Sequence, residues 1–346
     1  MLGDELGGLI DEDEVLLGGE VPIHGHCGDA GGLGDVGHRY RVVAVVGEQS
    51  HRVRLDQAPC LGTPSFPQVW LPLTHVLDTT IMLVTNIQMV EDVGDLAGRT
   101  ALVTGASRGI GQAIATRLAA EGVTVIVHFG TDEAGAAATL DAMEHAGGSG
   151  FAVRAELGVD GDVETLFAGV EAGLGGRPLD IVVNNAAAAP AGALGVTTRA
   201  EFDHLFAVNV RAPYFIIERA LPLLREGARI ISISSVATRM ANSSQTSFAM
   251  TKGAIETMTK TLAAQLGPRG ITVNAVAPGA TRTASNGAVF DVPGLAEQIS
   301  GMTALSRLGA PDDVADVVAF LASDAARWVT GQILDASGGL FLGPRT

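Results

Sequence analysis

Residues Thr104–Gly111 read TGASRGIG and follow the short segment RTALV at 99–103, which reads as a buried strand. Glycines at 105, 109 and 111 permit a tight turn and let backbone amides approach a bound anion. The helical pattern that starts near Ile110, IGQAIATRLAAEG, would direct its positive N-terminus at the same anion. The stretch therefore predicts a strand, a glycine turn and a helix that together hold the phosphates of a nucleotide.

From residue 95 onward, short apolar runs alternate with segments of helical pattern. The expected strands are 99–105, 123–129, 150–157, 179–185, 228–235, 271–278 and 331–336, and the expected helices between them include 132–147, 162–175, the segment around Lys252 and 311–323. Strands that are apolar on both faces and alternate with helices indicate a parallel sheet covered on both sides. We expect an α/β fold, a doubly wound Rossmann-like sheet, as a single domain over residues 91–346.

Residues 1–90 differ in character, because they show no sustained hydrophobic period. Both cysteines, Cys27 and Cys60, and five of the eight histidines fall in this segment. We expect a low-structure N-terminal extension, either poorly ordered or translated from a misplaced start, with Met82 and Met89 as alternative starts. RYRVVAVVG and HRVRL are candidate short strands of an irregular hairpin. HGHC at 24–27 has no second ligand pair at a suitable spacing, so we expect no metal site.

Charge limits the classes of partner. The formal net charge is −16, whereas a protein that binds nucleic acid through phosphates needs a basic face. The first residues are acidic where a secretory signal would be basic, and the apolar residues are dispersed rather than gathered in one spanning run. We expect a cytoplasmic protein with no nucleic-acid or membrane partner.

The end of the second expected strand bears on the choice of cofactor. An NAD-binding protein usually has a carboxylate here for the ribose 2′-hydroxyl, but the sequence has His128, Phe129 and Gly130. Asp132 follows too late and is suited to opening the next helix. Arg108 in the glycine turn can pair with a 2′-phosphate, or is only a solvated turn residue. We therefore expect NADP(H) to be preferred, with NAD(H) still possible.

Five motifs occur in one order: TGASRGIG, then NNAA at 184–187, SS at 234–235, a helix with Lys252, and VNAVAPGATRT at 273–283. In this order they resemble the short-chain dehydrogenase/reductase family, and within it the 3-oxoacyl-carrier-protein reductase branch, over about residues 95–343. Ala187 stands where the family usually has glycine. The resemblance implies reversible hydride transfer between a nicotinamide cofactor and a ketone or secondary alcohol, with a small-molecule substrate and a homotetrameric assembly.

The resemblance also assigns site residues. The catalytic set falls on Asn209, Ser235, Phe248 and Lys252, and the cofactor-binding set on Gly105, Ser107, Arg108, Gly109, Ile110, Gly111, Asn185, Lys252, Pro278, Gly279 and Thr283. Asn209 would hold a water linked to the lysine, or is merely a capping amide. Residues 284–307 have the mixed polarity of a substrate lid.

Phe248 departs from the family, which has tyrosine as the proton donor at this position. Phenylalanine preserves the packing of the ring and removes the acid, which typically contributes 10²–10⁴-fold in rate. Three interpretations follow: a slow reductase or one with a substitute donor such as Ser235, Thr251 or a water; an inactive NADP(H)-binding relative that serves as a sensor or subunit partner; or a deliberately inactivated variant. We expect an oxidoreductase whose activity is in doubt.

Overall fold

The computed structural model describes residues 96–342 and, in the first 88 residues, only strands. The chain divides into two units, Met1–Asp92 and Val93–Thr346. The strands described in the first unit are β1 (Ile10–Asp11), β2 (Glu14–Pro22), β3 (Arg39–Val46), β4 (Val53–Leu55), β5 (Val69–Leu71) and β6 (Val84–Gln88). The expected strands are present as β3 and β4, but the expected hairpin between them is wrong: β3 pairs with β2 and β6, and β4 pairs with β5. HGHC and both cysteines lie outside the described residues.

The second unit is built on a seven-stranded parallel sheet, as the alternating pattern predicts. Its strands are β7 (Thr100–Val103), β8 (Thr124–Phe129), β9 (Ser149–Arg154), β10 (Leu179–Asn184), β11 (Leu224–Ile233), β12 (Thr272–Pro278) and β13 (Ile333–Ala336). Their order in the sheet is β13-β12-β11-β10-β7-β8-β9, and every neighbouring pair is parallel. The chain therefore reverses its direction of winding between β7 and β10, and a crevice for ligands forms at such a point.

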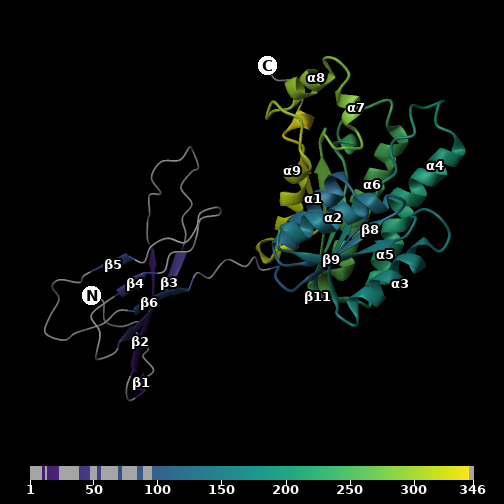
Figure 1. Ribbon diagram of the computed structural model, residues 1–346. Helices are drawn as coiled ribbons and strands as arrows, with labels where there is room; N and C mark the ends of the chain where they lie inside the picture. Colours follow the sequence, from purple (N-terminus) through teal and green to yellow (C-terminus); the bar gives the residue numbers. More distant parts are fainter. Residues whose placement is uncertain are drawn as a thin grey trace. The chain divides into compact units, whose positions relative to one another are not determined.

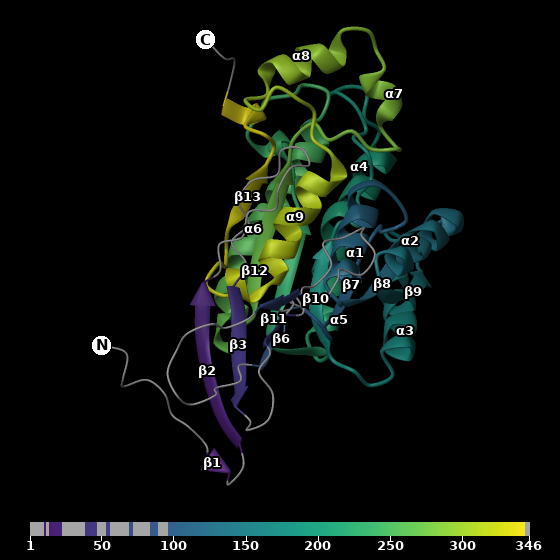
Figure 2. The ribbon, with the colours of Figure 1, turned by 60° about the vertical axis from the view of Figure 1, so that its left-hand side comes forward.

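Helices cover both faces of the sheet (Figures 1 and 2). One face carries α1 (Gly109–Ala120), α2 (Glu133–His145) and α9 (Pro311–Ala322), and the other carries α3 (Asp162–Leu174), α5 (Ala212–Ala220) and α6 (Thr246–Leu266). Each face encloses its own apolar core, with Ile114, Leu118 and Val318 on the first and Leu166, Ile216 and Leu266 on the second. Burial of both strand faces explains why the strands are apolar throughout.

Local signals fix where several helices begin. The side chain of Asp132 accepts a hydrogen bond from the Gly135 amide and caps α2, which confirms that Asp132 opens the helix. Thr198 and Glu201 form a capping box at the start of α4 (Arg199–Phe206), and Pro311 occupies the first turn of α9. These caps satisfy backbone amides that have no partner within the helix.

The segment expected to be a lid contains two short helices, α7 (Gly287–Phe290) and α8 (Leu295–Met302). Both lie at the same end of the second unit in Figures 1 and 2. The chain enters this segment shortly after the carboxyl end of β12, which is an interior strand of the sheet.

Candidate active site

The glycine turn between β7 and α1 has the backbone that its sequence predicts. Gly105 and Gly109 have φ of 62° and 59°, which side-chain-bearing residues rarely adopt. At Gly111, an added Cβ would lie 2.2 Å from the Gly105 carbonyl oxygen and 2.4 Å from Asn185 Nδ2. No side chain caps the first turn of α1, so its amides and positive end are available to an anion such as a pyrophosphate.

Gly105 is held from both sides by side chains of neighbouring segments. Its amide donates to His128 Nδ1 at 3.1 Å, and its carbonyl accepts from Asn185 Nδ2 at 3.0 Å. Asn185 Nδ2 also donates to the Thr104 carbonyl at 2.8 Å. The structure thus brings Asn185, expected at the cofactor, against the turn. His128, which stands where an NAD-binding protein usually has a carboxylate, contacts the same residue.

Arg108 and Asp132 lie at the outer side of the turn. The Arg108 side chain is 62% exposed, and its Nη1 is 4.0 Å from Asp132 Oδ2. Asp132 is occupied as the cap of α2. Ser107 is buried. The guanidinium therefore remains in solvent, able to approach an anionic group beside the turn.

Lys252 and Phe248 share one side of α6, as their spacing predicts. Lys252 is buried, and its Nζ lies 5.4 Å from the centre of the Phe248 ring. The same Nζ donates to the Ile233 carbonyl, at the end of β11, at 2.8 Å. Burial lowers the pKa of Lys252 to about 8, because a low-dielectric surrounding disfavours the charged amine.

Asn209 lies in a π-helical segment, Ala207–Arg211, between α4 and α5. Its Oδ1 accepts from the Ala188 amide at 2.8 Å, and its Nδ2 donates to Thr251 Oγ1 at 3.2 Å. Thr251 in turn donates to the Phe248 carbonyl at 2.7 Å. Asn209 therefore ties the loop after β10 to α6. A π-bulge often marks a functional site, but no residue type in this segment signals one.

The two serines after β11 have different partners. Ser234 Oγ donates to Glu256 Oε1 at 2.8 Å, and Thr238 Oγ1 donates to the same oxygen at 2.8 Å. Ser235 Oγ instead accepts from the Ala237 amide at 3.1 Å. Since that bond uses only a lone pair, the Ser235 hydroxyl hydrogen stays available to a substrate oxygen. This difference favours Ser235 over Ser234 as the substrate-facing hydroxyl.

The segment after β12 returns to the glycine turn. Pro278 ends β12, and a Cβ on Gly279 would lie 2.9 Å from Ser337. Thr283 Oγ1 is 3.0 Å from Ser285 Oγ. A Cβ on Gly109 would lie 3.4 Å from Thr283 Cβ, so residues far apart in the sequence meet at the start of α1.

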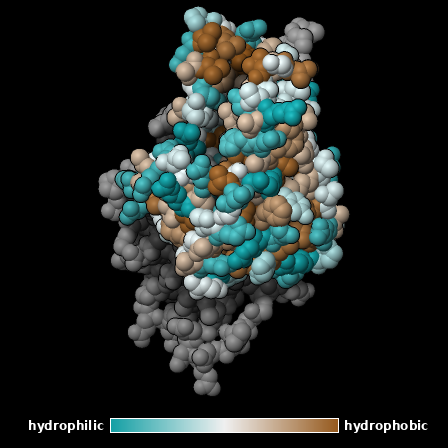
Figure 3. All heavy atoms as spheres, turned by 90° about the vertical axis from the view of Figure 1, so that its right-hand side faces the viewer, coloured by the Kyte–Doolittle hydropathy of each residue, from teal (hydrophilic) through white to brown (hydrophobic). Residues whose placement is uncertain are grey.

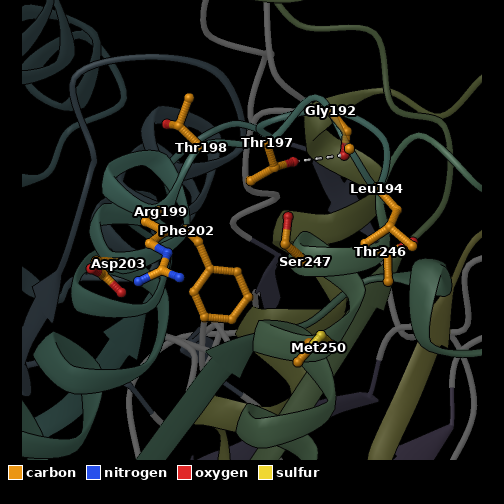
Figure 4. Close-up of a pocket in the computed structure, with 11 residues that line it drawn as sticks. Gly192, Leu194, Thr197, Thr198, Arg199, Phe202, Asp203, Thr246, Ser247 and Met250 are labelled. Carbon is orange, nitrogen blue, oxygen red and sulfur yellow. Dashed lines mark hydrogen bonds between the residues drawn. The ribbon is translucent and has the colours of Figure 1, made fainter.

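A cavity of about 440 Å³ lies between α4 and the start of α6 (Figure 4). Its walls include Phe202 and Asp203 of α4 and Ser247 and Met250 of α6. Ser247 Oγ is buried without a hydrogen-bond partner among the described residues. Ser235, Phe248 and Lys252 are not among the residues that line this cavity, although Ser247 directly precedes Phe248.

Among residues 96–342, no cluster of three potential metal ligands occurs. In the described part of the chain, no helix is both long and apolar enough to cross a membrane. Of the two tyrosines, Tyr40 has a side chain outside the described residues. Tyr214 lies on α5 with 49% of its surface exposed and packs edge-on against Phe215. Among the described contacts, Tyr214 has none with Ser235 or Lys252.

Known proteins with the same arrangement are numerous. A family model described as Enoyl-(Acyl carrier protein) reductase matches residues 105–341. The 3-oxoacyl-[acyl-carrier-protein] reductase of Staphylococcus aureus is 37% identical over 247 residues, which cover 70% of this chain and 98% of that protein.

Two solved ketoreductases are more similar. The reductase LugOII, described as catalysing keto-reduction at C1 during lugdunomycin biosynthesis, is 50% identical with a TM-score of 0.70, and the match covers 72% of this chain and all of that one. The angucycline C-6 ketoreductase LanV, solved with NADP, is 48% identical with a TM-score of 0.69, over 72% of this chain and 98% of that one. The fold, the motifs and these similarities agree: the chain belongs to the short-chain dehydrogenase/reductase family.

Proposed function

We propose that this protein is an NADP(H)-dependent ketoreductase that interconverts a ketone and a secondary alcohol, with Phe248 in place of the usual acid. The observation that carries the proposal is the buried Lys252 beside the Phe248 ring. Lys252 contacts the carboxyl end of β11, and the glycine turn follows the carboxyl end of β7 in the same sheet. Relatives that are 48–50% identical to the chain are ketoreductases by description, one of them solved with NADP.

The residues of the turn fit NADP(H). The uncapped first turn of α1 suits a pyrophosphate, and Gly111 leaves no room for a side chain that would displace it. Arg108 is the cation that would meet a 2′-phosphate, and Asp132 is engaged as a helix cap rather than free to hold a 2′-hydroxyl. These features support NADP(H) over NAD(H), and Asn185, Pro278, Gly279 and Thr283 complete the proposed cofactor-binding set.

In the proposed reaction, NADPH would supply, when bound, the hydride that the carbonyl carbon receives. Lys252 would bind the nicotinamide ribose hydroxyls and contribute positive charge, and Ser235 would hold the carbonyl oxygen through its free hydroxyl hydrogen. Asn209 would fix the position of α6 through Thr251. Phe248 fills the place of the acid but has no proton to give.

Two protein hydroxyls, those of Thr251 and Ser235, are candidates to replace the missing proton donor. The Thr251 hydroxyl already donates to the Phe248 carbonyl, so its hydrogen is committed to the helix. The hydroxyl hydrogen of Ser235 has no acceptor among the described residues. Of the two protein hydroxyls, Ser235 is therefore the better substitute donor, directly or through a water.

For the substrate, we propose a ketone of the angucycline type. LanV has been solved with NADP and rabelomycin and is 46% identical in that structure, whereas the 3-oxoacyl-carrier-protein reductase is only 37% identical. The test is single-turnover NADPH oxidation with rabelomycin, compared with a 3-oxoacyl thioester. Faster oxidation with the thioester would contradict the proposed substrate class.

The same experiment separates the enzyme from its alternative, an NADP(H)-binding sensor or subunit partner, which Phe248 favours. NADPH binding with turnover of either ketone supports the enzyme. Tight NADPH binding without oxidation of any carbonyl, in both the native chain and Phe248→Tyr, supports the sensor.

We also propose a cytoplasmic homotetramer. A groove between α5 and α6 is lined by Tyr214, Phe215, Ala254 and Met258, among others, and both aromatic rings are more than 40% exposed. Figure 3 shows hydrophobic residues scattered among hydrophilic ones on the side of the molecule that carries α4 and α5. The exposed aromatic rings that line the groove, rather than these scattered residues, suit an interface between copies. Light scattering should give a tetrameric mass that Ala254→Glu reduces, and a monomeric mass for the native chain would refute the proposal.

Residues 1–88 are proposed to be dispensable for cofactor binding, because the family match begins at residue 105. A chain that starts at Met89 should bind NADPH as tightly as the full chain. Insolubility or weaker binding would show that the N-terminal unit is a structural part of the reductase.

A further inference from the structure

His128 is the next-to-last residue of β8, and its ring is turned into the protein. Only 1% of the residue is exposed. Nδ1 accepts from the Gly105 amide at 3.1 Å, and Nε2 lies 2.9 Å from the Ala155 carbonyl oxygen. A nitrogen that accepts must be unprotonated, and one that faces a carbonyl must carry the hydrogen. These partners therefore select the neutral ring with its proton on Nε2.

The His128 ring is the partner of the Gly105 amide, whereas Asn185 holds the Gly105 carbonyl on the other side of the residue. Gly105 has a left-handed backbone conformation, which residues with a side chain rarely adopt. A Cβ there would lie 2.9 Å from Ala186 Cα. The Ala106 amide donates to the His128 carbonyl at 2.9 Å, so His128 holds two successive amides of the turn, one through its ring and one through its backbone.

We propose that His128 is a positioning residue for the cofactor: its neutral ring orients the Gly105 peptide so that the turn presents its amides to the dinucleotide phosphates, and protonation of the ring weakens binding. This inference rests on the proposed NADP(H)-dependent function. His128 does not touch the cofactor in this scheme, but acts through Gly105.

The charge around His128 is consistent with a neutral ring. Burial lowers its pKa to about 4, partly opposed by the hydrogen bond to Ala155. The ionisable side chains on adjoining segments are Arg108, Asp132, Arg154, Glu156 and Asp162. The first four reach solvent. Asp162 accepts from the Gly158 and Val163 amides. None of the five forms a hydrogen bond to the ring among those described.

The sign of the pH effect follows from the lowered pKa. Above the ordinary value of 6.5, His128 is neutral in both the folded and unfolded chain, and its contribution to stability is fully present. As the pH falls from 6.5 towards 4, the unfolded chain binds a proton that the folded chain does not, so this contribution is lost. A protonated Nδ1 would also face the Gly105 amide, donor against donor.

The test uses three variants of the full chain. In His128→Asn, the amide oxygen can accept from Gly105 as Nδ1 does, but the side chain does not titrate. In His128→Leu, the acceptor is removed. Ile126→Ala, in the same strand and equally buried, is a control that loses stability without touching the turn. NADP⁺ affinity is measured by calorimetry at pH 7.5, at a temperature where circular dichroism shows all four proteins folded.

We expect the affinity of His128→Asn for NADP⁺ to lie within about threefold of the native chain's. The affinity of His128→Leu should be at least about tenfold lower, which is a loss of about 1.4 kcal/mol of binding free energy. Ile126→Ala should bind normally. When the pH is lowered from 7.5 to 4.5, the melting temperature of the native chain should fall further than that of His128→Asn. Normal binding by His128→Leu, or equally weak binding by both His128 variants, would overturn the inference alone. Failure of the native chain to bind NADP⁺ would instead overturn the proposed function, and this inference with it.

Discussion

The nucleotide end and the chemical end of the site differ in how closely they follow the family. At the glycine turn, Gly105, Gly109 and Gly111 have the conformation or close contacts that require glycine. At α6, Lys252 is buried in its expected place, but the ring beside it belongs to Phe248 and carries no hydroxyl. We therefore expect cofactor binding and proton transfer to be separable in this protein, so that each can be perturbed without the other.

Gly111→Ala should produce the largest loss, and at the nucleotide end alone. Its Cβ would lie 2.2 Å from the Gly105 carbonyl oxygen, and overpacking of this kind costs about 1–3 kcal/mol. We expect NADPH affinity to fall by up to about 100-fold, measured by fluorescence titration. Gly301→Ala, where an added Cβ meets nothing within 4 Å, is the control. Unchanged binding by Gly111→Ala would mean that the turn is not the phosphate site.

Phe248→Tyr should act at the chemical end alone. The ring already lies 5.4 Å from Lys252 Nζ, so the new phenol would have a cation beside it to lower its pKa. We expect single-turnover NADPH oxidation to rise about 10²-fold, with NADPH affinity nearly unchanged. If the native chain is already fast and tyrosine does not help, the proton has another source, and Ser235→Ala is the next variant to measure.

The pH dependence of the rate should report Lys252. Burial lowers its pKa to about 8, so the amine loses its charge as the pH rises through that value. We expect the rate to fall about tenfold per pH unit above it. Stability should change in the opposite direction: between about pH 8 and 10.5 the unfolded chain holds a proton that the folded chain has released, so stability rises with pH. If the rate of Lys252→Met falls at the same alkaline pH as that of the native chain, the titrating group is not Lys252.

The sequence predicted what depends on local pattern. The apolar runs form the seven strands of the sheet. Asp132 caps α2, as expected for a carboxylate at the start of a helix. The contacts of His128 depend instead on the register of β8 against β9, which brings Ala155 within reach. A histidine within an apolar run was the available signal, since a buried polar group needs partners.

Other features of the site had no local signal. The π-helical segment at Asn209 depends on how α4 and α5 pack, not on a residue type that favours it. Glu256 accepts from both Ser234 and Thr238, which meet it only after α6 has docked on β11. The two short helices in the expected lid were likewise not distinguished from loop by their mixed polarity. Long-range packing decides each of these.

The smallest effect we expect is at the edge of the nucleotide end, where Arg108 should set the preference for NADPH over NADH. Its side chain is 62% exposed and lies 4.0 Å from Asp132, so solvent and a carboxylate both weaken its attraction for a 2′-phosphate. Arg108→Gln should therefore reduce NADPH affinity by only about tenfold or less and leave NADH affinity unchanged. Arg117→Gln, an exposed arginine of the same helix that pairs with Glu121, should change neither affinity. Added salt should reduce the difference in NADPH affinity between the native chain and Arg108→Gln, because salt screens the attraction between Arg108 and the 2′-phosphate. An equal loss for both cofactors would assign Arg108 to the shape of the turn, and no loss for either would leave it a solvated turn residue.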